Sequence, residues 1–133
     1  MLPIEILNDK PRYPYRGLML DTARRYYSLD SIINLLNVMA TAKFNVLHWH
    51  IVDDESFPLE LKTSFPNLTF NAAFQEDEVY TQDMVRLIIE HATKLAIRVI
   101  PEFDNPGHTR AIGMDPYFNE VVRCFDKFNN YNL

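Results

Sequence analysis

The chain has 133 residues, of which 47% are hydrophobic and 23% are charged, a composition typical of one globular domain. The formal net charge of −5 and the lack of a basic run argue against a protein that binds nucleic acid. No apolar stretch approaches the ~20 residues that span a bilayer, and the N-terminal stretch lacks the basic and apolar regions of a signal peptide.

Segments typical of strands and helices alternate from the N-terminus. Residues 17–21 (GLMLD) predict a short buried strand. Residues 28–43 predict a helix with Ser28 as its N-cap and Asp30 in its first turn, where the helix dipole favours an acid. The stripe expected to face the core consists of Leu29, Ile32, Ile33, Leu36 and Met39.

Two further strands flank a second helix. Residues 44–52 (FNVLHWHIV) predict the second strand and residues 97–103 (IRVIPEF) the third. Between them, residues 81–96 predict a helix capped by Thr81. Its inward residues are expected to be Met84, Ile88, Ala92 and Leu95. Residues 114–133 lose clear periodicity and are expected to form an irregular or incomplete tail.

Strands that are separated by helices pair in parallel, which leaves two architectures open. A doubly wound open sheet would be favoured by a glycine-rich loop after the first strand, but the three glycines are Gly17, Gly107 and Gly113. A (β/α)8 barrel places its functional residues at the C-terminal ends of its strands. The three predicted strands end in polar stretches, DTARR, HWHIVDDE and PEFDNPGH, which indicates the rim of one active site.

Strand periodicity separates polar from apolar side chains in the second strand. One face carries Val46, His48, His50 and Val52, and the other carries Leu47, Trp49 and Ile51. In the third strand one face carries Arg98, Ile100, Glu102 and Asp104. Trp49 is expected to lie in the core rather than to serve as an aromatic platform for a ligand.

Several of these polar residues also fit purely structural roles. His48 and His50 are compatible with hydrogen-bonded core histidines or, together with Asp53, with metal ligands. Glu102 could pair with Arg98.

The flanking loops carry further charged residues. Of Arg24 and Arg25, only one can easily point into a site. Glu55 is expected to lie in a solvated loop.

Three stretches, RGLMLDTARRYY, NVLHWHIVDDESFPLE and PEFDNPGHT, together resemble glycoside hydrolase family 20, the β-N-acetylhexosaminidases, in order and spacing. The resemblance covers about residues 11–113. It implies that residues 1–133 are a fragment of one catalytic (β/α)8 barrel, roughly its first three strands and two helices. A complete barrel needs about 250 residues.

The resemblance also implies a reaction. Family members remove terminal N-acetylglucosamine or N-acetylgalactosamine from glycans with retention of configuration. The acetamido oxygen of the substrate attacks the anomeric carbon while a glutamic acid protonates the leaving oxygen. This chemistry uses no metal or other cofactor.

The resemblance implies a role for several residues at the strand ends. Arg24 would hydrogen-bond hydroxyls of the terminal sugar, for which the fork of a guanidinium is suited. Asp53 would pair with His108, and this pair would support the general acid. The remaining rim and structural residues would be Asp21, His50, Glu102 and Asp104.

One departure from the family pattern affects the expected activity. The catalytic Asp-Glu pair of the family follows a Gly-Gly-Asp-Glu stretch after the fourth strand, and the chain has no such stretch. We therefore expect the isolated chain to be inactive. Two alternatives are a non-catalytic remnant that binds amino sugars or a partner, and a metal-dependent hydrolase that uses His48, His50 and Asp53.

The resemblance further implies a lysosomal or secreted protein whose full-length relatives are often dimeric. Asn67, in the glycosylation pattern Asn-Leu-Thr, is consistent with that route. Cys124 is the single cysteine and would pair with a cysteine beyond residue 133.

Overall fold

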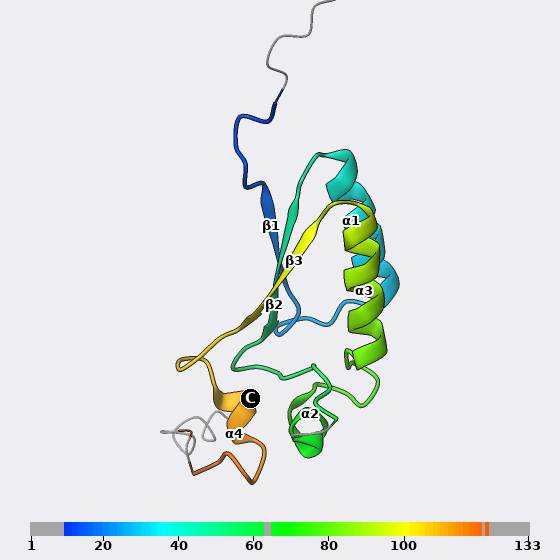
Figure 1. The fold of residues 1–133 in the computed structure, drawn as a ribbon. Helices are drawn as coiled ribbons and strands as arrows, with labels where there is room; N and C mark the ends of the chain where they lie inside the picture. Colours follow the sequence, from blue (N-terminus) through cyan, green and yellow to red (C-terminus); the bar gives the residue numbers. More distant parts are fainter. Residues whose placement is uncertain (1–9, 63–64, 121, 123–133) are drawn as a thin grey trace, which may run out of the picture.

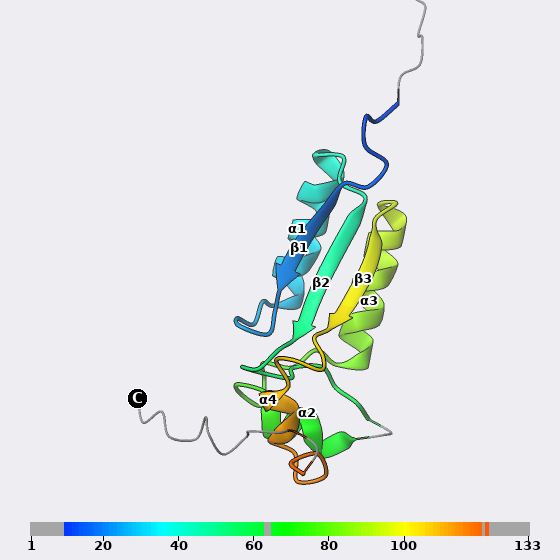
Figure 2. The same ribbon diagram turned by 90° about the vertical axis from the view of Figure 1, so that its left-hand side faces the viewer.

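Three parallel strands form one sheet in the order β1–β2–β3 in the computed structural model, which describes residues 10–62, 65–120 and 122. The strands are β1 (Gly17–Asp21), β2 (Val46–Val52) and β3 (Arg98–Phe103). Figure 2 shows β2 between the other two, with all three running in one direction.

Two long helices connect the strands and lie side by side on one face of the sheet (Figure 1). They are α1 (Leu29–Thr41) and α3 (Gln82–Lys94). A doubly wound sheet reverses its strand order and carries helices on both faces, and the described strands and helices do neither. The architecture is therefore that of a partial α/β barrel, as the sequence predicted.

Both helices begin at the predicted caps. The Ser28 hydroxyl accepts a hydrogen bond from the Ser31 N–H at 3.3 Å, and the Thr81 hydroxyl accepts one from the Met84 N–H at 3.2 Å. Each hydroxyl satisfies an N–H group that has no partner within the helix.

Both helices also end in the same way, in a turn that leads into the next strand. After α1, the Phe44 N–H donates to the Met39 carbonyl at 2.9 Å, and Lys43 adopts φ 61°. After α3, the Ile97 N–H donates to the Ala92 carbonyl at 2.9 Å, and Ala96 adopts φ 56°. This is the Schellman motif, in which the left-handed position normally favours glycine.

We expect Ala96→Gly to stabilise the protein, because glycine removes the steric cost of a left-handed Cβ, about 1 kcal/mol. The matched control is Ala42→Gly. Ala42 is also exposed at a helix C-terminus but has φ −83°, so glycine there only adds freedom to the unfolded chain. The midpoint of urea unfolding should rise for Ala96→Gly and fall for Ala42→Gly. Equal shifts in both variants would refute this explanation.

The core lies between the sheet and the two helices and is centred on Trp49 and Tyr80. The predicted stripes are confirmed at Ile32, Leu36, Met39, Ile88 and Ala92, all of which are buried. Three further stripe residues, Leu29, Ile33 and Leu95, are partly buried and pack against this core. Met84 is partly buried as well.

The simple alternation of faces in β2 was wrong at its last residues. The register against β3 shifts between His50 and Val52, and both Ile51 and Val52 join the buried cluster. Such an irregularity bends the strand end and redirects its side chains. It lies directly before Asp53, where the polar rim begins.

Two short helices were not predicted, α2 (Pro66–Ala72) and α4 (Arg110–Gly113). Both lie beyond the C-terminal ends of the strands (Figure 1). Residues 114–120 form turns, and Cys124 lies outside the described residues. Within the described ranges, no helix has the length and apolarity that crossing a membrane requires.

Candidate active site

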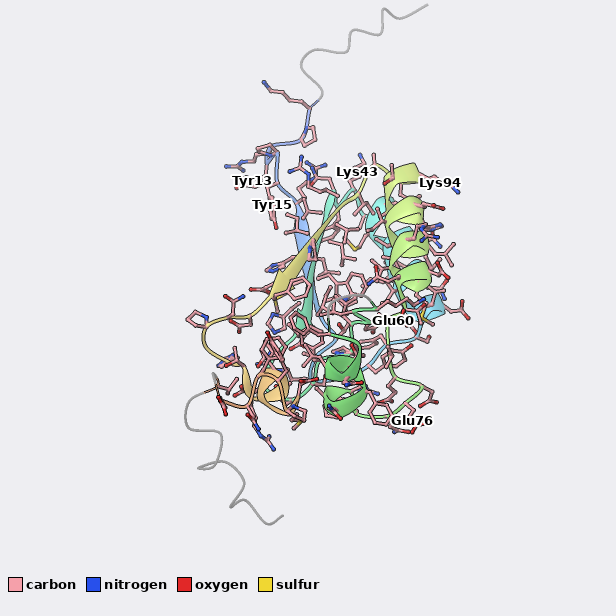
Figure 3. The ribbon with its side chains drawn as sticks, turned by 60° about the horizontal axis from the view of Figure 1, so that its bottom comes forward. Tyr13, Tyr15, Lys43, Glu60, Glu76 and Lys94 are labelled. Atoms are coloured by element: carbon pink, nitrogen blue, oxygen red, sulfur yellow. The ribbon has the colours of Figure 1, made fainter. Side chains whose placement is uncertain are left out.

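Polar side chains from all three strand ends converge at the end of the sheet that α2 and α4 adjoin. Asp21 ends β1, Asp53 follows β2, and Asp104 follows β3. Because the strands are parallel and in register, their C-terminal ends lie together. Figure 3 shows that Lys43 and Lys94 lie at the other end of the sheet, away from this group.

Arg24 links acids from two of these loops. Its Nη1 contacts the Asp21 carboxylate at 2.8 Å, its Nη2 contacts Asp53 at 2.7 Å, and its Nε contacts Glu55 at 2.9 Å. The side chain is 43% exposed, so one side of the guanidinium faces solvent while the other is held. The fork is therefore fixed in orientation but remains accessible.

The turn after β1 positions Arg24. One oxygen of Asp21 accepts hydrogen bonds from the backbone N–H groups of Ala23 and Arg24, at 3.0 and 3.1 Å. The Ser56 hydroxyl donates to the Ala23 carbonyl at 2.6 Å and ties this turn to the loop after β2. Asp21 thus lies at the end of β1 and holds the turn that follows it.

Asp53 is the most enclosed acid of the group, with a side chain that is 1% exposed. Its Oδ2 lies 2.7 Å from His50 Nε2 and 2.7 Å from Arg24 Nη2. Its Oδ1 accepts the Asp54 N–H at 2.6 Å and lies 3.3 Å from His108 Nδ1. The structure therefore brings Asp53 and His108 together.

Glu102 bridges the two histidines of β2. Its Oε2 lies 2.7 Å from His50 Nδ1 and 2.8 Å from His48 Nε2. The pairing of His50 with Glu102 across β2 and β3 sets this contact. Glu102 does not use Arg98, the partner considered from the sequence, because Arg98 is exposed at the other end of β3.

His108 lies in the loop before α4 and is held by two acids. Its Nδ1 is 2.9 Å from Asp104 Oδ2 as well as 3.3 Å from Asp53 Oδ1. Its backbone has φ 53°, a left-handed conformation that is rare for a non-glycine residue and is concentrated at functional sites. The ring is 56% exposed and can reach a bound molecule.

The contacts within this cluster lower the pKa values of two acids and raise those of two histidines. Burial alone would raise the pKa of the Asp53 carboxyl. The Asp54 N–H, the hydrogen bond from His50 and the charge of Arg24 outweigh burial, so this pKa lies below its usual value. The hydrogen bond from His50, with a smaller one from His48, likewise lowers the pKa of Glu102.

The pKa values of two histidines are raised. Burial would lower the pKa of His50, but the hydrogen bonds to Glu102 and Asp53 outweigh burial and raise it. The nearby charges of Asp53 and Asp104 raise the pKa of His108. These shifts favour the ionised form of Asp53 and Glu102 and the protonated form of His50 and His108.

One group of atoms has the composition of a metal site. Ligand atoms of His50, Asp53 and Asp104 lie within 4.8 Å of one another. Both ring nitrogens of His50 already face carboxylate oxygens, so neither offers a free lone pair. A metal ion could bind His50 only by displacing one of these carboxylate contacts.

Two residues of the site were not identified from the sequence. Glu55, expected in a solvated loop, is half-exposed but pairs with Arg24. Asp54 accepts the Arg110 N–H at 2.8 Å and anchors the start of α4. The feature of the sequence that could have identified both residues is their position directly after Asp53. Arg25 turns away, its guanidinium carbon lying 5.9 Å from the centre of the Tyr27 ring.

Comparison with known proteins identifies relatives of the chain. It is 50% identical over 119 residues to beta-hexosaminidase subunit beta of Mus musculus, which covers 90% of this chain and 22% of the relative. It is 52% identical over 108 residues to beta-hexosaminidase subunit alpha of Rattus norvegicus, covering 80% of this chain and 20% of the relative. The chain thus spans about a fifth of the length of these relatives.

A solved structure agrees with the sequence comparison. Flavobacterium johnsoniae chitobiase is similar with a TM-score of 0.77 and 38% identity, over 84% of this chain and 16% of the chitobiase. The profile of the catalytic domain of glycosyl hydrolase family 20 matches residues 13–131. The chain with the Arg24–Asp53–His108 cluster therefore belongs to glycosyl hydrolase family 20.

Proposed function

We propose that this chain forms the substrate-orienting part of a retaining β-N-acetylhexosaminidase. Its substrates would be glycans that end in N-acetylglucosamine or N-acetylgalactosamine. The observation that carries the proposal is the cluster of Arg24, Asp53 and His108 at the strand ends, in a chain about 50% identical to named beta-hexosaminidase subunits.

Arg24 would bind hydroxyls of the terminal sugar. A guanidinium has five N–H donors, and three contacts to acids leave two of them for a ligand. The contacts to Asp21 and Asp53 hold the plane of the fork, so little side-chain entropy is lost on binding. Glu55, which is 45% exposed, can adjust when a sugar arrives.

Asp53 and His108 would act on a general acid rather than on the sugar itself. Asp53 Oδ1 lies 3.3 Å from His108 Nδ1, so both acids that hold this ring contact the same nitrogen and not Nε2. Through Nε2, a cationic His108 would stabilise the ionised form of a nearby glutamic acid after it has given up its proton. In this proposal the general acid and the aspartate beside it come from residues other than those of this chain.

Three consequences follow, one for the chain alone and two for the complete protein. The chain alone would not hydrolyse N-acetylhexosaminides, because it lacks the general acid. The complete protein would travel the secretory route to the lysosome or the exterior, which the exposed position of Asn67 supports. Since the relatives are named as subunits, we also infer that it pairs with a second subunit.

A hybrid enzyme tests this function. The stretch of the Mus musculus subunit that matches this chain is replaced by the chain itself, which is 50% identical over that stretch. We expect the hybrid to release 4-nitrophenol from 4-nitrophenyl N-acetyl-β-glucosaminide and the isolated chain to release none. A folded hybrid without turnover would favour the non-catalytic remnant instead.

Within the hybrid, Arg24→Gln should lower kcat/KM by about 10- to 100-fold, the effect of losing one hydrogen bond to a charged donor. Arg25→Gln is the matched control, because Arg25 is its sequence neighbour but lies against Tyr27. It should leave kcat/KM unchanged. Equal losses in the two variants would show that Arg24 has no special contact with the sugar.

A further inference from the structure

His50 lies between two carboxylates that come from different elements. Its Nδ1 is 2.7 Å from Glu102 Oε2 on β3, and its Nε2 is 2.7 Å from Asp53 Oδ2 in the loop after β2. The imidazole is 8% exposed, so water cannot replace either partner. Both of its hydrogen-bonding positions are therefore fixed by the fold.

This geometry restricts where protons can reside. A neutral imidazole has one N–H, so one nitrogen lone pair would face a carboxylate oxygen at 2.7 Å. Two arrangements avoid that repulsion. Either His50 carries both protons between two ionised acids, or His50 is neutral and one of the acids is protonated.

The other partners of the two acids decide between these arrangements. Asp53 also contacts Arg24 Nη2 at 2.7 Å and accepts the Asp54 N–H at 2.6 Å. Glu102 Oε2 also contacts His48 Nε2 at 2.8 Å. The guanidinium and the backbone N–H are donors, and each stabilises the ionised form of Asp53. The Nε2–H tautomer of His48 does the same for Glu102. These partners place the proton on the imidazole.

We propose that His50 is a fixed imidazolium in the folded protein at neutral pH and a positioning residue for the Asp53–His108 pair. With Arg24, it holds Oδ2 of Asp53, which turns Oδ1 toward the Asp54 N–H and His108. It does not exchange protons during a reaction. Its role is to keep Asp53 ionised and in one orientation.

Acids from the ends of all three strands surround His50, and the neighbouring titratable base on its own strand, His48, contacts Glu102. Asp21 ends β1, Glu102 lies on β3, and Asp53 and Asp104 lie in the loops after β2 and β3. The cations nearby, Arg24 and His108, contact the same Asp53 carboxylate rather than the imidazole. The charges of Asp21 and Glu102 act in the same direction as the two hydrogen bonds and raise the pKa of His50.

The inference deepens the proposed function and rests on it for the meaning of the Asp53–His108 pair. The test of the protonation of His50 needs no substrate. The inference and the proposed function can therefore be refuted independently. A hybrid without turnover would refute the proposed function and would leave the protonation of His50 as described. A neutral His50 would overturn this inference even in a hybrid that turns over substrate.

The protonation state can be read directly by NMR of protein labelled with ¹⁵N in its four histidines. At about pH 7.5, a peptide histidine with a pKa near 6.5 is largely neutral. We expect both ring nitrogens of His50 to carry protons at that pH, and its titration midpoint to lie above the peptide value. One protonated and one bare nitrogen would overturn the proposal.

Glu102→Gln tests the cause of this state. Glutamine keeps the size of the side chain and an oxygen that can accept from Nδ1, but removes the charge. The titration midpoint of His50 should fall in this variant. Glu76→Gln is the matched control, since Glu76 is an exposed acid beyond α2 (Figure 3). An unchanged midpoint in Glu102→Gln, or an equal fall in both variants, would overturn the assigned role.

Discussion

Asp53→Asn should destabilise the protein and nearly abolish turnover of the hybrid enzyme. The carboxylate is 1% exposed and balances His50 and Arg24 at 2.7 Å each. Asparagine has the same shape but no charge, and its NH₂ group would oppose one of the donors. Because Arg24 is partly solvated, the loss should lie at the lower end of the range for broken buried ion pairs, about 3 kcal/mol.

The same substitution should lower kcat by about 10²- to 10⁴-fold, the usual contribution of a general acid, since His108 loses the acid that orients it. KM should change less, because Arg24 keeps Asp21 and Glu55. Asp54→Asn is the matched control. Its amide oxygen can still accept the Arg110 N–H, so stability and turnover should stay near those of the parent.

The pH dependence of stability provides a second readout for Asp53. Its pKa is lowered in the folded state, so the folded protein binds fewer protons than the unfolded chain and the contribution is present above the unfolded pKa of about 3.9. It is lost as the pH falls through the lowered pKa. The free energies of unfolding of the parent and Asp53→Asn, measured with urea from pH 6 down to acidic pH, should therefore converge. A constant difference would show that charge is not the cause.

The helices that cover the sheet could be predicted because their signals are local. Ser28 and Thr81 cap helices whose apolar stripes repeat at helical spacing. Apart from a proline in its first turn, α2 carries no such signal. Phe65 offers its first turn no side-chain hydrogen bond, and its seven residues are too few for a repeating stripe. It is fixed instead by tertiary contacts, such as the Phe57 N–H donating to the Ala72 carbonyl.

For the site, the sequence indicated which residues meet, and the resemblance implied the pairing of Asp53 with His108, but the other pairings could not be predicted. Parallel strands bring their C-terminal ends together, so the position of Asp53 near Asp104 follows from topology. The partner of Glu102 depends on register. His50 lies opposite Glu102 in the β2–β3 pairing, and only the packed sheet fixes that alignment. Arg98 shares a predicted face with Glu102 but lies too far along the strand.

Trp49→Ala should lower the free energy of unfolding by about 3–5 kcal/mol, the range for removing a large buried aromatic side chain. Trp49 is 1% exposed, and its ring meets Tyr80 edge to face with centroids 5.1 Å apart. A domain of ordinary stability retains little after such a loss. The midpoint of urea unfolding should fall accordingly. Phe70→Ala removes an aromatic ring that is 72% exposed and should change stability by less than about 0.5 kcal/mol.

Part of the Trp49 effect should come from one hydrogen bond, which links the core to the site. The indole Nε1 donates to the Thr22 hydroxyl at 2.9 Å, and Thr22 directly follows Asp21 at the end of β1. A cycle of Trp49→Phe, Thr22→Val and the double variant isolates this bond, with an expected coupling of about 0.5–1.5 kcal/mol. Strict additivity would mean that the tryptophan stabilises by packing alone. A measurable coupling would mean that the core also holds the turn from which Arg24 reaches Asp53.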